Sequence, residues 1–146
     1  MGGSILGAEA IYNFLNFKIK KKVLFVNNLK RQQETIHLPK KLINIIISKS
    51  GNTLQTILNS NVLIKKDNKN IFITENKESY LKQLAQNLKA EIVNHNNFIG
   101  GRYSVLSEVG MLPVELMGLS EKKFKQFNYL IKSKVFIKNL INNVSN

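Results

Sequence analysis

The chain has 146 residues and no cysteine, so it is long enough for one domain, and disulfides, thiolate metal ligands and a cysteine nucleophile are excluded. No apolar run approaches a membrane span and no signal peptide is recognisable, which predicts a cytoplasmic protein without a membrane partner. The net charge of +13 comes almost entirely from lysine, and Arg31 and Arg102 are the two arginines. AT-rich codons produce Lys, Asn and Ile together, so we interpret the lysines as a solvated surface. We therefore predict no nucleic-acid partner.

The first predicted element is a helix that follows the glycine-rich turn Gly2-Gly3-Ser4-Ile5-Leu6-Gly7. Apolar residues recur after it at helical spacing: Ala8, Ile11, Tyr12, Leu15 and Ile19. Such a turn normally follows a buried strand that aims it, and none precedes it here, so we expect the chain to be cut within a motif. The alternative is a flexible glycine tail before a surface helix. Lys18 to Lys22 ends the helix, and Val23-Leu24-Phe25-Val26 is predicted to be a short buried strand.

The middle of the chain alternates between strands and helices. Asn27 to Lys41 is polar, with a short helix broken by Pro39 as one interpretation and His37 expected at the surface. Strands are predicted over 42–47, 71–74 and 91–93, and helices over 53–64 and about 77–89. This alternation predicts an α/β fold in which a parallel sheet carries helices on both faces. In such sheets ligands bind beyond the carboxyl ends of the strands.

The stretch that follows the strand 42–47 predicts a phosphate cradle. Ser48, Ser50 and Thr53 offer hydroxyl groups, Gly51 allows close backbone approach, and Lys49 adds charge. The next helix begins there, and the first N–H groups of a helix lack partners and carry partial positive charge. The spacing is not that of a Walker loop. The alternative is an ordinary βα turn in which Ser50 or Thr53 is the helix N-cap.

A second candidate group follows the strand 91–93, in Gly100-Gly101-Arg102-Tyr103-Ser104. Arg102 is informative because this chain uses lysine almost everywhere else, and a guanidinium is a planar, bidentate donor. It suits a phosphate, a carboxylate or a developing enolate. The alternative is a structural salt bridge to Glu108 or Glu115.

The last part of the chain is predicted to be helical. Val105 to Gly118 is an apolar helix that Pro113 kinks or restarts. Ser120 is predicted to cap a further helix with Glu121 in its first turn. We interpret the apolar residues of that helix as core, namely Phe124, Phe127, Leu130, Ile131, Val135, Ile137, Leu140 and Ile141.

Three motifs now stand in order along the chain: Gly2 to Gly7, Ser48 to Thr56, and Gly100 to Ser107 with the trailing Val109-Gly110-Met111-Leu112-Pro113. Together they resemble the glucose-6-phosphate isomerase family in its N-terminal sugar-isomerase (SIS) domain. The resemblance implies a flavodoxin-like, doubly wound three-layer sandwich. It places the SIS domain at residues 1–119, apparently without its first strand. Residues 120–146 would be a helical extension toward an absent second SIS domain.

The resemblance also implies a reaction and the residues that serve it. The family interconverts glucose 6-phosphate and fructose 6-phosphate in glycolysis and gluconeogenesis through an enediolate, needs no metal or cofactor, and usually forms homodimers. Arg102 would stabilise the enediolate. The substrate-binding residues would be Gly3, Ser4, Ser48, Lys49, Ser50, Gly51, Asn52 and Thr53.

The sequence departs from the family pattern in what it lacks. The family's catalytic glutamate, histidine and lysine lie well beyond the arginine motif, and neither His37 nor His95 matches. Because isomerisation needs a positioned base, we expect this chain alone to be inactive. Asn52 and Gln55 stand where the family more often has threonine and glutamate. The alternative function is a stand-alone, non-catalytic SIS domain that senses a sugar phosphate, although sensor domains are not expected to carry the Gly101-Arg102 motif.

Overall fold

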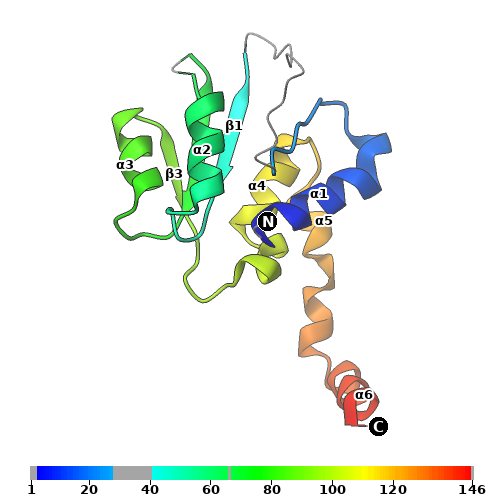
Figure 1. Ribbon diagram of the computed structural model, residues 1–146. Helices are drawn as coiled ribbons and strands as arrows, with labels where there is room; N and C mark the ends of the chain where they lie inside the picture. The colour runs from blue at the N-terminus through cyan, green and yellow to red at the C-terminus, as the bar shows by residue number, and fades with distance from the viewer. Residues whose placement is uncertain (1–2, 28–40, 66, 146) are drawn as a thin grey trace.

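The computed structural model describes residues 3–27, 41–65 and 67–145 (Figure 1). The predictions made for Gly2, His37, Pro39 and the short helix between Asn27 and Lys41 lie outside the described residues. So does the side chain of Phe127.

A parallel sheet of three strands is the centre of the fold. The strands are β1 (Ile43–Ile47), β2 (Lys69–Thr74) and β3 (Glu91–Asn94), hydrogen-bonded in the order β1-β2-β3. Runs of β-branched residues favour this pleated, buried conformation. The register places Ile47 beside Ile73 and Ile73 beside Val93, so these side chains share one face. The strands predicted over 42–47, 71–74 and 91–93 and their parallel arrangement are confirmed.

One face of the sheet is covered by α2 (Leu54–Leu63) and α3 (Tyr80–Asn87). Phe72 is fully buried there in a core with Ile46, Leu81 and Ala85. The Ser79 hydroxyl caps α3 by accepting a hydrogen bond from the backbone N–H of Lys82. These two helices are the crossovers that a parallel sheet requires.

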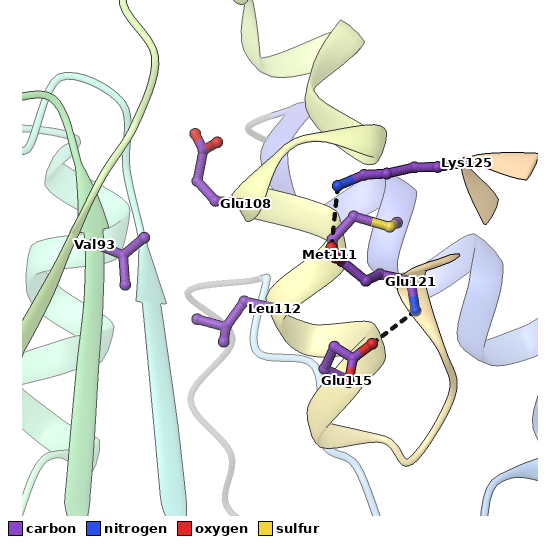
Figure 2. Close-up of a pocket in the computed structure, with 7 residues that line it drawn as sticks. All are labelled: Val93, Glu108, Met111, Leu112, Glu115, Glu121 and Lys125. Carbon is purple, nitrogen blue, oxygen red and sulfur yellow. Dashed lines mark hydrogen bonds and ion pairs between the residues drawn. The ribbon is translucent and has the colours of Figure 1, made fainter. Parts of the chain in front are cut away.

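The other face is covered by α4 (Glu108–Leu116), with α1 (Gly3–Leu15) and the 3-10 helix η2 (Gly101–Leu106) packed against it. Leu112 of α4 and Val93 of β3 point toward each other (Figure 2). Ile73 is fully buried, and the outer helices bury Ala8, Val109 and Val114. Helices therefore flank the sheet on both sides, and the predicted three-layer α/β sandwich is confirmed.

Several helix boundaries differ from those predicted, most clearly those of α1 and α4. α1 ends at Leu15 and is followed by the 3-10 helix η1 (Asn16–Lys18). The helix predicted from Val105 begins only at Glu108, because Ser107 accepts a hydrogen bond from the N–H of Val109 and caps it there. Pro113 lies inside α4, which continues through it rather than restarting.

The strand predicted over Val23–Val26 is wrong, since these residues form no strand. Within the described ranges the sheet consists of β1, β2 and β3, and residues 23–26 do not join the open edge of β1. An extended segment without a partner leaves its backbone groups unpaired. Phe25 instead packs edge-on against Tyr12, with ring centroids 5.5 Å apart.

The C-terminal helix is divided into α5 (Glu121–Phe124), the 3-10 helix η3 (Gln126–Lys132) and α6 (Lys134–Ser145), which extends away from the layers (Figure 1). The interpretation of its apolar residues as core is wrong for most of them, because α6 packs mainly on η3; Phe124 and Leu130 are half-buried. Large side chains there are exposed, including Ile131, Val135, Ile137, Leu140 and Ile141.

Ser120 stands at the N-cap of α5 without a capping side-chain bond, which corrects its predicted role. The Glu115 carboxylate accepts the N–H of Glu121 at 2.7 Å instead. Throughout the described segments, no helix combines the length and apolar character needed to cross a membrane.

Candidate functional site

The loop of residues 48–53, here called the cradle loop, leaves the sheet at the carboxyl end of β1. Ser48 is still part of the sheet edge: its N–H donates to the carbonyl of Ile73 at 3.0 Å, and the residue is buried. Gly51 then turns the chain with φ of +66°, a left-handed conformation that favours glycine. The loop therefore sits where parallel α/β sheets bind ligands.

The hydroxyl groups of the cradle loop form one cluster. The Ser48 and Thr53 hydroxyl oxygens are 2.9 Å apart, and that of Ser50 is 3.4 Å from Thr53. The Ser50 oxygen also accepts the N–H of Asn52 at 3.2 Å. Thr53 occupies the N-cap position of α2 but makes no capping side-chain bond. Thr53 is thus the N-cap residue, as the alternative of an ordinary βα turn expected, but its hydroxyl does not cap the partly positive start of α2.

Hydrogen bonds from the start of α3 hold the cradle loop in position. The Gly51 carbonyl accepts the N–H of Leu81 at 3.0 Å, and the Asn52 side-chain oxygen accepts the N–H of Tyr80 at 2.9 Å. A Cβ on Gly51 would clash with the Ser79 hydroxyl oxygen. Asn52, predicted to bind substrate, thus uses its side-chain oxygen to hold the loop on α3.

Lys49 reaches across the carboxyl edge of the sheet. Its ammonium nitrogen donates to the carbonyl of Asn97 at 2.8 Å and lies 3.5 Å from the Glu75 carboxylate. Glu75 also pairs with Lys77 at 2.8 Å. The hydrogen bond from Lys77, followed by the contact with Lys49, holds the pKa of Glu75 below its ordinary value of 4.5, although partial burial opposes the shift.

The first and third motifs lie against each other at the start of α1 and η2. A Cβ on Gly3 would come within 2.7 Å of the backbone nitrogen of Arg102, and one on Gly101 would lie 3.2 Å from the Ser4 hydroxyl oxygen. Gly7 likewise faces Val105, where a Cβ would meet the side chain at 2.7 Å. Glycines in both motifs therefore let these two segments approach closely.

Arg102 is exposed, and in the part of the chain that the structure describes it makes no ion pair. The two glutamates weighed as its partners are engaged elsewhere. Glu108 accepts the N–H of Asn96 at 3.1 Å, and Glu115 accepts that of Glu121. Neither Glu108 nor Glu115 therefore forms the structural salt bridge with Arg102.

Sequence reasoning missed two titratable residues at this edge. Glu75 directly follows β2 and contacts Lys49. His95 directly follows β3; its Nδ1 is 2.9 Å from a Glu108 carboxylate oxygen, and both ring nitrogens are buried without a hydrogen-bond partner among the described residues. The signal that could have found them is position, because a polar residue immediately after a predicted parallel strand lies at the ligand-binding edge.

A separate hollow of about 320 Å³ lies between β3, α4 and α5 (Figure 2). We call it the acidic hollow, because Glu108, Glu115 and Glu121 line it beside apolar Val93 and Leu112. Lys125 reaches over it and pairs with Glu121 at 3.1 Å. Three carboxylates repel an anion, so the acidic hollow does not suit a phosphate.

The chain is similar in sequence to proteins of known function. The sequence model of the family described as phosphoglucose isomerase matches residues 1–142. The glucose-6-phosphate isomerase of Acholeplasma laidlawii is 35% identical over 142 residues, covering 84% of this chain and 33% of that protein. The enzyme of the same name from Methanocaldococcus jannaschii is 33% identical, covering 84% of this chain and 33% of that protein. The one from Staphylococcus saprophyticus is 32% identical, covering 99% of this chain and 37% of that protein.

A solved structure shows the same fold. The crystal structure of a hypothetical protein from Thermus thermophilus matches with a TM-score of 0.68 and 26% identity, covering 81% of this chain and 31% of that one. The chain thus spans about a third of the length of the relatives and the structure that it matches.

Proposed function

The chain belongs to the phosphoglucose isomerase family, and we propose that it is the part of a glucose-6-phosphate isomerase that binds the sugar phosphate and stabilises the enediolate. The observation that carries this proposal is the hydroxyl cluster of Ser48, Ser50 and Thr53 at the start of α2. Hydroxyl donors and the first N–H groups of a helix together suit a phosphate.

Arg102 supplies the second half of the proposed site. Its backbone is seated on Gly3, while its exposed guanidinium makes no ion pair among the described residues. During the proposed interconversion of glucose 6-phosphate and fructose 6-phosphate, a proton moves between C1 and C2 and an oxyanion develops. A guanidinium fixed beside that oxygen stabilises it. The close approach of Gly3 to Arg102 and of Gly101 to Ser4 supports this pairing of the first and third motifs.

We further propose that the chain alone does not turn over its substrate. The reaction also needs a base that reaches C1 and C2, and in the relatives about two thirds of the protein lies outside the matched part. We expect purified chain to show no isomerase activity above background. Turnover that is lost in Arg102→Ala would contradict this expectation.

The proposal also covers the domain organisation, cellular location and partners of the protein. Residues 1–119 form the SIS domain, and residues 120–146 form a helical extension that packs on a second domain. The exposed apolar side chains of α6 support this assignment. The complete protein is expected to be a cytoplasmic homodimer that acts on sugar phosphates without nucleic-acid or membrane partners. No observation here favours the alternative of a stand-alone sensor.

Calorimetry tests the binding function directly. We expect fructose 6-phosphate to bind and fructose not to bind, because the phosphate supplies the charge that the cradle recognises. Removing two hydroxyl groups with Ser50→Ala and Thr53→Ala should weaken binding by a few kcal/mol, since hydrogen bonds to charged groups contribute about 1.5–3 kcal/mol each.

The matched control for that experiment is Ser133→Ala with Ser145→Ala. It removes the same number of hydroxyl groups from the start and end of α6, away from the cradle loop. Binding should be unchanged. Equal affinity of the wild type and the cradle double variant would rule out the cradle assignment.

A further inference from the structure

The ammonium group of Lys49 joins three segments at the carboxyl edge of the sheet. Lys49 follows β1, Glu75 follows β2, and Asn97 lies after β3 on residues 95–102, here called the arginine loop. The ammonium donates to the Asn97 carbonyl at 2.8 Å and lies 3.5 Å from the Glu75 carboxylate. The side chain of Lys49 is thus committed to two partners that belong to this chain.

Glu75 is itself fixed. Its N–H donates to the carbonyl of Lys49 at 3.1 Å, and Lys77 binds its second carboxylate oxygen at 2.8 Å. The Thr74 hydroxyl also donates to the Lys49 carbonyl at 3.3 Å. The carboxylate therefore faces Lys49 from a position set by backbone and side-chain bonds on both sides, and such charge-assisted contacts are the stronger ones.

The arginine loop can pass this restraint on to Arg102. The side-chain oxygen of Asn96 accepts the N–H of Phe98, and the backbone carbonyl of Asn96 accepts the N–H of Ile99. The Gly100 carbonyl then accepts the N–H of Tyr103 at 2.9 Å. Consecutive turns of this kind make the loop a connected unit, so holding the Asn97 carbonyl restricts the segment that carries the guanidinium.

We propose that Glu75 is a positioning residue: it holds Lys49 as a strap between the cradle loop and the arginine loop, and Lys49 is not a direct ligand of the substrate phosphate. This inference rests on the proposed function. It changes the role of Lys49 from the one that the sequence resemblance implied. Phosphate recognition then falls to the hydroxyl cluster and the start of α2.

The two roles of Lys49 predict opposite effects of Glu75→Gln. If Lys49 is a strap, loss of the carboxylate loosens the arginine loop, and the Kd of fructose 6-phosphate rises at least about fivefold, the lower end of typical coupling between sites. If Lys49 were a direct ligand, removal of a competing negative charge would tighten binding. Tighter or unchanged binding therefore overturns the proposal.

Glu78→Gln is the matched control. Glu78 lies on the same β2–α3 connection, but it pairs with Lys82 on the surface at 3.2 Å, away from Lys49. Its removal changes the net charge equally and should leave the Kd unchanged. In a double-variant cycle, adding Lys49→Met to Glu75→Gln should produce little further loss, because both substitutions break the same strap.

Amide hydrogen exchange of the ligand-free chain tests the strap without any substrate. Glu75→Gln and Lys49→Met should each speed exchange over residues 96–100, and Glu78→Gln should not. Unchanged exchange in both strap variants overturns the proposal. If the wild type fails to bind fructose 6-phosphate, the proposed function fails, whereas the exchange result still decides whether the strap exists.

Discussion

Gly3 and Arg102 are in direct contact although they lie at opposite ends of the domain sequence: a Cβ on Gly3 would approach the backbone nitrogen of Arg102 to 2.7 Å. The start of α1 therefore packs directly against the part of η2 that carries Arg102. This contact joins the first and third motifs, and the Lys49–Asn97 hydrogen bond of 2.8 Å joins the second motif to the loop before Arg102.

Gly3→Ala should displace Arg102. Because the added Cβ meets backbone atoms that cannot rotate away, we expect a loss of about 1–3 kcal/mol in the free energy of unfolding, as for other overpacked sites. Urea denaturation measures it. Gly100→Ala is the control, since its Cβ would make an ordinary contact of 3.5 Å with Tyr103 and its φ of −69° suits any residue. Equal losses in both variants would contradict the assigned contact.

Gly51→Ala should be costlier than Gly118→Ala. Both glycines have left-handed backbones, with φ of +66° and +88°. A Cβ on Gly51 would meet Ser79, whereas one on Gly118 would have no atom of the described residues within 4 Å. Left-handed strain costs about 1–2 kcal/mol, and the clash adds about 1–3 kcal/mol at Gly51 alone. Thermal unfolding of the two variants compares them. A larger loss for Gly118→Ala would show that the clash is relieved without cost.

Stability should depend on pH through Glu75. Its pKa is lowered in the folded chain, chiefly by Lys77, so its contribution to stability is fully present above the ordinary value of 4.5 and is lost as the pH falls below it through the folded value. Glu75→Gln should therefore lower the urea midpoint at pH 7 and have a smaller effect at pH 3. Glu78→Gln serves as control. A constant difference between wild type and Glu75→Gln at both pH values would show that the carboxylate charge is not responsible.

The apolar face of α6 should tolerate charge. Leu140 and Ile141 are 53% and 60% exposed, so Ile141→Lys should change the free energy of unfolding by no more than about 0.5 kcal/mol. It should also reduce self-association in sedimentation velocity, because the exposed apolar surface is smaller. Val114→Ala is the contrast: this side chain is fully buried in α4, and its truncation should cost about 2 kcal/mol. Strong destabilisation by Ile141→Lys would mean that α6 packs elsewhere in solution.

Much of the candidate site could be predicted because its signals are local. Ser48, Ser50 and Thr53 lie together on one loop because they are neighbours in sequence and the strand before them ends at a defined edge. The roles of Lys49 and Asn52 could not be predicted in the same way. Their partners, Glu75 with Asn97 and Tyr80, come from later segments, and the geometry between segments is not a property of either alone.

By itself, the sequence determined the order of strands and helices between residues 42 and 94, the parallel arrangement and the position of three glycine-containing motifs. Hydrophobic period, chain alternation and backbone freedom are local or topological properties. Only the tertiary structure decided that Val23–Val26 forms no strand, that the apolar side chains of α6 are exposed, and that Glu75 faces Lys49. A strand needs a neighbour, a core residue needs a covering surface and a charge needs a partner. Each of these is supplied by a part of the chain that lies far away in sequence.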